Sequence, residues 1–188
     1  MKFAVDYLED LKKTIAGLNT VAIGQAVSIL KEARDRGRTV FVCGNGGSAA
    51  VASHLVVDLL KGASYGRESR FRIISLADNI PTVTAYVNDV GSDAVFVEQL
   101  KNFARKDDVV LAISGSGASR NVLAAVEYAN GIDCRTIGMT SVDGGALGDL
   151  VGLNLSVPSG HMGRLEDSFM VMAHILAYAF IERAVENP

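Results

Sequence analysis

The sequence predicts an α/β fold in which a parallel sheet is covered by helices on both faces. Five short apolar runs have the length and composition of buried strands: residues 39–43, 71–76, 109–113, 135–140 and 153–157. Segments with helical spacing separate these runs, and this alternation is typical of a doubly wound sheet. Glycine- and serine-rich loops follow two of the runs. Ligands bind at this edge of such sheets, so the loops are the first candidates for a binding site.

The chain length of 188 residues suits one domain over 1–188. Two apolar stripes at helical spacing precede the first strand, and they predict an N-terminal hairpin of antiparallel helices within 1–36, with Thr20 as the cap of the second helix. The doubly wound core is then expected over 37–188. Its helices are predicted in the following segments: 48–62, 81–86, 94–104, 120–130 and 165–186.

Composition excludes several classes of protein. Hydrophobic residues make up 49% of the chain, enough for a sizeable core, and the net charge of −3 disfavours a nucleic-acid partner. No signal peptide is expected because acidic residues interrupt the first apolar pattern. No membrane span is expected because the most apolar segment, 169–181, is too short. With Cys43 and Cys134 interpreted as ordinary reduced, buried residues, a cytoplasmic location is predicted.

The two loops have the features of a phosphate site. Residues 44–48 read GNGGS and residues 114–119 read SGSGAS, and each loop connects a strand to a helix. Glycines let the backbone approach a ligand, and helix N-termini offer unpaired N–H groups. Neither loop matches GxxxxGK[ST] or GxGxxG, so a P-loop or dinucleotide site is disfavoured. The alternative explanation is that each loop is a simple tight turn. Two such loops at one edge of the sheet make this explanation weaker than it is for a single loop.

Two histidines and two carboxylates form a candidate zinc set. His54 and Asp58 are four residues apart on one helix face, while Glu166 and His174 belong to the last helix. Each of these residues alone could also be a paired polar residue of the core. Eight residues of regular helix, about 12 Å, separate Glu166 from His174, so both cannot easily bind one ion. Either the helix begins after Glu166, or different subunits contribute ligands. His161 is expected in a loop and is assigned no role.

Five motifs resemble the sugar isomerase (SIS) domain family, and within it the phosphoheptose isomerases. They are CGNGGSAAVASH at 43–54, YVNDVG at 86–91, AISGSGASRNVL at 112–123, GMTSVDGGAL at 138–147 and RLEDSFMVMAHIL at 164–176. The resemblance covers nearly the whole chain. It implies a three-layer α/β/α sandwich with a five-stranded parallel sheet, assembled as a homotetramer with sites between subunits.

The resemblance also implies roles for individual residues. Asp58 and His174 fall on the family's acid/base pair, and His54, Asp58, Glu166 and His174 fall on its zinc ligands. The substrate, a phosphorylated sugar, is expected to contact ten residues: Asn45, Gly46, Gly47, Ser48, Asp89, Ser114, Gly115, Ser116, Ser119 and Glu166. The expected reaction is a ketose–aldose isomerisation through an enediol, most directly of sedoheptulose 7-phosphate.

The chain departs from the family pattern at several of these positions. Asp58 replaces a usual glutamate, Glu166 a usual glutamine, and Gly115 and Ala118 a threonine and an asparagine. Two alternatives therefore stay open: an isomerase of another ketose phosphate, and a non-catalytic scaffold that binds a replication initiator. The scaffold relatives lack an acidic residue at the Asp58 position and the second histidine, so Asp58 and His174 favour the enzyme. A regulator's sensor domain is disfavoured because no DNA-binding module is attached.

Overall fold

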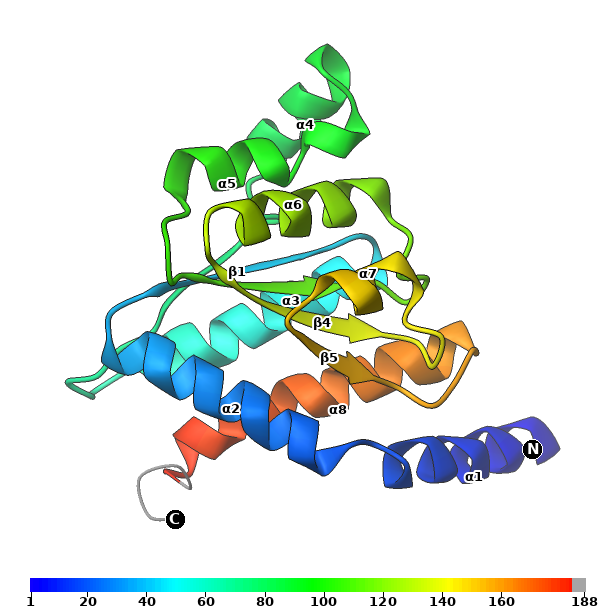
Figure 1. Cartoon of the computed structure of the whole chain (residues 1–188). Coiled ribbons are helices and arrows are strands. Elements are labelled where there is room, and N and C mark those ends of the chain that lie inside the picture. Colours follow the sequence, from blue (N-terminus) through cyan, green and yellow to red (C-terminus); the bar gives the residue numbers. More distant parts are fainter. Residues whose placement is uncertain (184–188) are drawn as a thin grey trace.

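A five-stranded parallel sheet forms the centre of the computed structural model, which describes residues 1–183 (Figure 1). Its strands are β1 (Thr39–Gly44), β2 (Arg72–Ser75), β3 (Val109–Ile113), β4 (Arg135–Thr140) and β5 (Leu153–Ser156). They lie in the order β2-β1-β3-β4-β5, and every neighbouring pair is parallel. Because β1 and β3 are adjacent, the loops that follow them meet at the same edge of the sheet.

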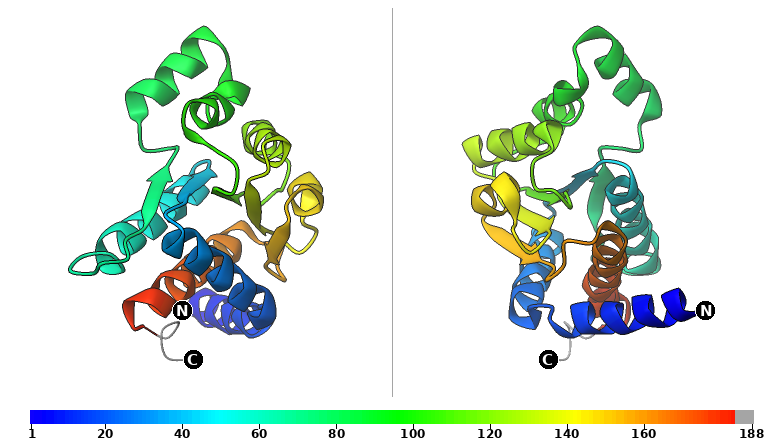
Figure 2. Two further views of the ribbon diagram at one scale, coloured as in Figure 1. Left: turned by 60° about the vertical axis from the view of Figure 1, so that its left-hand side comes forward. Right: turned by 90° about the vertical axis from the view of Figure 1, so that its right-hand side faces the viewer.

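Helices cover both faces of this sheet (Figures 1 and 2). One face carries α2 (Thr20–Asp35), α3 (Gly47–Val57) and α8 (Met162–Ile181), and the other carries α5 (Val97–Phe103), α6 (Arg120–Gly131) and α7 (Gly145–Leu150). Side chains of the strands alternate between the two buried clusters, with Val40 and Val42 in one and Phe41 and Cys43 in the other. The predicted three-layer sandwich is confirmed.

The N-terminal helices differ from the predicted hairpin. α1 (Lys2–Ala16) does not pack along α2; it extends away from it and lies against α8 (Figure 2). Two polar contacts hold it there: the Tyr7 hydroxyl donates to Asp167 at 2.6 Å, and Arg164 donates to Asp10 at 3.0 Å. The hydrogen bond to Asp167 raises the pKa of Tyr7. The antiparallel arrangement is therefore wrong, because the polar residues of α1 have their partners on α8.

Several predicted helices have different bounds. The helix expected to run to residue 62 is α3 followed by a π-helical turn, η1 (Asp58–Gly62), and the segment 94–104 contains α5 after a short 3-10 turn, η2 (Ser92–Ala94). α4 (Ile80–Asp89) is longer than expected, and α7 was not predicted. α8 begins before Glu166, and the predicted end of this helix at residue 186 lies outside the described residues. The cap of α2 is Asn19 rather than Thr20; its side chain accepts from the Ala22 N–H at 3.0 Å.

Both cysteines are free thiols, but their surroundings differ. Cys43 is fully buried in the sheet, and burial raises its pKa to about 12. Cys134 is only partly buried, which corrects the expectation for it, and its pKa is raised to about 11, mainly by desolvation. Among residues 1–183, no helix combines the length and the apolar character that a membrane crossing requires.

Candidate active site

The GNGGS loop carries the chain from β1 into α3 at the carboxyl edge of the sheet. Gly46 has φ +54°, a conformation that favours glycine, and α3 begins at the next residue. Gly44 lies against β3, where an added Cβ would be only 3.0 Å from the Ile113 carbonyl oxygen. Ser48, in the first turn of α3, is buried. The loop is thus packed closely against the neighbouring strand, with the helix N-terminus at the edge.

The SGSGAS loop gathers three hydroxyls after β3. The Ser114 Oγ lies 3.5 Å from the Ser116 Oγ and 3.2 Å from the Ser119 Oγ. The Ser116 hydroxyl also accepts from the Ala118 N–H at 3.2 Å. Ser119 is the N-cap of α6, but its side chain makes no capping hydrogen bond and stays with the other hydroxyls. This cluster of donors at a helix N-terminus has the chemistry of a phosphate cradle.

A turn that contains Gly144 and Gly145 packs against the backbone of the serine loop. An added Cβ on Gly117 would overlap the Gly144 carbonyl, and one on Gly145 would lie 2.6 Å from the Ser116 carbonyl oxygen. The Leu147 N–H donates to the Gly117 carbonyl at 2.9 Å. All three glycines also have φ between +56° and +69°. The DGG motif therefore has a packing role, which sequence reasoning left unassigned: it fixes the shape of the serine loop.

Asn45 and Asn121 join the two loops. Each amide donates to the other at 2.9 Å, so the pair forms a reciprocal bridge between the GNGGS loop and the first turn of α6. Both line a pocket at this edge that also includes Ser92 and Phe96. Sequence reasoning missed Asn121. Its position two residues after Ser119, in the first helical turn after the serine loop, was the available signal.

Asp89 lies apart from the loops in this chain. It ends α4, which projects from the molecule and has no buried residue (Figure 2). Its carboxylate is exposed and accepts from the Asn88 amide at 2.6 Å. Among residues 1–183 no hydrogen bond or ion pair links Asp89 to the serine or GNGGS loop. The expectation that Asp89 lines the sugar site stays a prediction.

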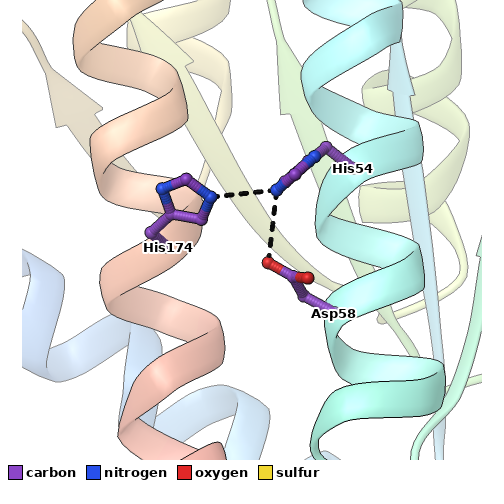
Figure 3. A group of neighbouring side chains, drawn as sticks. All are labelled: His54, Asp58 and His174. Atoms are coloured by element: carbon purple, nitrogen blue, oxygen red, sulfur yellow. Dashed lines mark hydrogen bonds and ion pairs between the residues drawn. The ribbon is translucent and has the colours of Figure 1, made fainter.

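His54, Asp58 and His174 converge between α3 and α8 (Figure 3). The two Nε2 atoms are 2.9 Å apart, and the His54 Nε2 is 3.4 Å from an Asp58 carboxylate oxygen. One ligand atom from each residue lies within 4.8 Å of the others. The three side chains, far apart in sequence, therefore form a single cluster on the surface between the two helices.

The cluster fits a zinc ion by chemistry and by spacing. Imidazole nitrogens and a carboxylate are the ligands of catalytic zinc, and tetrahedral bonds of about 2.0–2.1 Å place ligand atoms about 3.3 Å apart. The observed separations of 2.9 and 3.4 Å lie on either side of that value. In addition, the Asp58 Oδ2 is buried and accepts no hydrogen bond from residues 1–183 beyond its 3.4 Å contact with the His54 Nε2, so a cation would supply a further partner.

Glu166 does not join this cluster within the chain. α8 is already helical at Glu166, which excludes the alternative that the helix begins after it. Its carboxylate lies against Gly47, where an added Cβ would overlap it. Glu166 is thus at the N-terminus of α3, beside the GNGGS loop. A metal bond from Glu166 to the same ion would require another subunit, which is the alternative that stays open.

Exposed apolar side chains are close in sequence to the cluster residues in both helical segments. Val57 is 52% exposed and Ile175 is 42% exposed, and Leu60 and Tyr178 are also exposed. Large apolar side chains gathered on one face are typical of a surface that another protein covers. The segments that carry the candidate metal cluster therefore also carry apolar side chains of the kind found at interfaces.

Comparison with known proteins agrees with this architecture. Residues 5–141 match the SIS domain family. Phosphoheptose isomerases from Helicobacter hepaticus and Geobacter sulfurreducens are each 37% identical to the chain over 169 residues; the first alignment covers 89% of this chain and 85% of the relative, the second 90% and 87%. A solved phosphoheptose isomerase from Francisella tularensis superposes with a TM-score of 0.88 and 29% identity, covering 97% of both chains. The chain therefore belongs to the SIS domain family and, within it, to the phosphoheptose isomerases.

Proposed function

We propose that this protein interconverts sedoheptulose 7-phosphate and an aldoheptose 7-phosphate through an enediol. Membership of the phosphoheptose isomerase family supports the reaction class. The observation that carries the proposal is the cluster of His54, Asp58 and His174, because proton transfer between neighbouring carbons needs an acid and a base at one place. A scaffold protein would have no need to bring two imidazoles and a carboxylate together in this way.

The phosphate is assigned to the serine loop and the sugar to the adjoining edge. Ser114, Ser116 and Ser119 present three hydroxyls that can donate to phosphate oxygens. Ser48 and the N–H groups of the first turn of α3 lie at the neighbouring helix N-terminus. Gly46 has open space beside it and lets the ligand approach the backbone, whereas Gly47 and Gly115, also assigned to the substrate, have Glu166 and Met162 against them. Asn45 offers an amide for a sugar hydroxyl, and Asp89 and Glu166 offer carboxylates.

Asp58 and His174 are proposed to move the proton. One of them takes a proton from the carbon beside the carbonyl and returns it to the neighbouring carbon, while the other exchanges a proton with the carbonyl oxygen. The Asp58 carboxylate faces the His54 ring, with its Oδ2 3.4 Å from the Nε2, so an acceptor of protons lies beside the two imidazoles (Figure 3). His54 holds the pair in position through its contacts with both residues.

We also propose that His54, Asp58 and His174 bind zinc, with Glu166 of a neighbouring subunit as the fourth ligand. A zinc ion bound there supplies a Lewis acid that polarises a carbonyl oxygen. The exposed apolar side chains near the cluster in sequence support a homotetramer with sites between subunits. A cytoplasmic location remains a prediction.

The test is turnover across a panel of pentulose, hexulose and heptulose phosphates, with added zinc and with chelator. We expect sedoheptulose 7-phosphate to be the best substrate. His174→Ala and Asp58→Asn should each lower kcat by about 100-fold or more, the usual contribution of an acid or base. The matched control is His161→Asn, which replaces a histidine outside the cluster with another good N-cap and should keep turnover.

Two results would decide against the proposal. Absence of turnover on the whole panel, with and without zinc, would remove the isomerase function; recovery of a replication initiator by such an inactive protein would support the scaffold instead. Preference for a shorter ketose phosphate would keep the reaction class and change the substrate. Zinc content, measured by mass spectrometry, should be about one ion per chain and should be lost in His54→Ala.

A further inference from the structure

A second pocket with basic lining lies at the opposite edge of the sheet, where the strands begin. Arg38 precedes β1, Arg72 opens β2, and Arg105 lies in the loop before β3, and all three line this pocket. The five residues of β3, at about 3.3 Å each, separate this edge from the serine loop. The pocket is thus distinct from the candidate active site.

Two of the three arginines of this pocket, Arg72 and Arg105, lack the acidic partner that neighbouring arginines have. Arg36 and Arg135, just outside it, both pair with Glu32, at 2.9 and 2.5 Å. Within residues 1–183 the guanidinium groups of Arg72 and Arg105, both exposed, form no ion pair or hydrogen bond.

Arg38 supplies an independent observation. One of its terminal nitrogens pairs with Asp107 at 3.2 Å, but its Nε is buried and has no hydrogen-bond partner among the described residues. A buried N–H without an acceptor is costly, and its presence beside two unpaired guanidinium groups points to an acceptor that the chain itself does not supply.

The acidic residue of the pocket does not fill this need. Asp108 is buried, and its two carboxylate oxygens accept from the backbone N–H groups of Thr39 and Arg105, at 2.8 and 2.9 Å. Its charge therefore serves to fix the backbone at the start of β1 and β3. The lining is left with three arginines around one opening, of which Arg38 is paired with Asp107 while Arg72 and Arg105 have no acidic partner within residues 1–183.

We propose that this pocket binds a small phosphate-containing anion of the diphosphate class. Guanidinium groups bind phosphate oxygens through paired N–H donors, and three of them around one opening suit an anion with several charges better than a single carboxylate. The rim carries Phe103, which is 58% exposed, and Ile74, so an organic group on the diphosphate would contact apolar side chains.

The experiment is calorimetric titration of the full chain with inorganic pyrophosphate at near-physiological salt. We expect saturable binding at one site per chain that the double variant Arg72→Gln/Arg105→Gln weakens about tenfold or more, since hydrogen bonds to charged groups are lost. Arg70→Gln is the matched control. It removes an exposed arginine two residues from Arg72 but outside the pocket, and it should change the affinity by less than about twofold.

A serine-loop variant separates the two sites. Ser116→Ala/Ser119→Ala should keep pyrophosphate binding at the arginine pocket. Binding that disappears in the serine variant and persists in the arginine variant would overturn the proposal, as would the absence of binding to the wild-type chain. If the arginine variant does not fold, hydrogen exchange of the wild-type chain decides: pyrophosphate should protect residues 102–108, and protection confined to 114–121 would contradict the proposal.

Discussion

Gly117 is the glycine of the serine loop with the least space for a side chain. It has φ +62°, and an added Cβ would overlap the backbone carbonyl of Gly144, which cannot move aside as a flexible side chain could. We expect Gly117→Ala to lower the free energy of unfolding by about 2–4 kcal/mol, because backbone strain and overpacking add. Chemical denaturation measures the change.

Gly24 provides the control for this prediction. It lies inside α2 with nothing within 4 Å of an added Cβ. Gly24→Ala should therefore raise the free energy of unfolding by about 0.5–1 kcal/mol through helix propensity. Equal effects of the two substitutions would show that the Gly117 contact does not constrain the loop.

At the residue scale, groups of side chains close in sequence could be predicted, but contacts between side chains far apart in sequence could not. The serine hydroxyls and the face shared by His54 and Asp58 follow from short spacings, so the sequence indicated them. The Asn45–Asn121 bridge joins residues 76 positions apart, so no local spacing indicates that these two side chains pair. Glu166 could not be placed either, because its position beside Gly47 depends on how α8 packs along α3.

Among the elements, the π turn after α3 depends on one buried hydroxyl. Ser64 is fully buried; its Oγ donates to the Leu59 carbonyl at 2.7 Å and accepts from the Phe71 N–H at 2.9 Å. Ser64→Ala should lower the free energy of unfolding by about 2–4 kcal/mol, because it leaves two buried backbone groups unsatisfied.

Ser28→Ala is the matched control for Ser64. The Ser28 Oγ donates to the Gly24 carbonyl at 3.0 Å on the exposed side of α2, where water can replace it. This substitution should change the unfolding free energy by less than about 0.5 kcal/mol. If thermal and chemical denaturation do not separate the two variants, the hydroxyl of Ser64 does not stabilise the turn.

The sequence could predict most elements but not their irregularities. The spacing of apolar residues predicted the strands and the long helices, because the buried face of each element must be apolar. A π turn needs one extra residue in a helix, and the apolar pattern of 48–62 does not reveal it. The predicted packing of α1 along α2 is wrong for a related reason. The apolar stripe of α1 must be buried against another element, but its periodicity does not identify that element. The polar pairs Tyr7–Asp167 and Arg164–Asp10 determine that choice.

For the whole molecule, the exposed apolar surface of α1 indicates assembly. Phe3, Val5 and Leu8 are all exposed, and Leu8 is 56% accessible. Burial of such a side chain contributes about 1.5–3 kcal/mol. We expect Leu8→Glu to shift the proposed tetramer towards smaller species at micromolar concentration, as measured by light scattering after size exclusion.

The control for this surface is Gln25→Glu, which adds the same charge at an exposed position on α2. It should leave the molecular mass unchanged. A wild-type chain that is monomeric, or a Leu8→Glu variant that assembles as the wild type does, would contradict the role given to α1. The fold class could be predicted from the alternation of strands and helices alone. Assembly could not, because it depends on exposed faces that another copy of the chain would cover.

The contact between His54 and His174 has a consequence for the unfolded chain. The two residues are 120 positions apart, so an ion held by both would close most of the chain into one loop. A cross-link over about 100 residues removes enough chain entropy to stabilise a fold by roughly 4–5 kcal/mol in the loop-closure estimate. A zinc ion there would be a removable cross-link between the two halves of the chain. Chelation should therefore lower the melting temperature of the wild type but not that of His174→Ala.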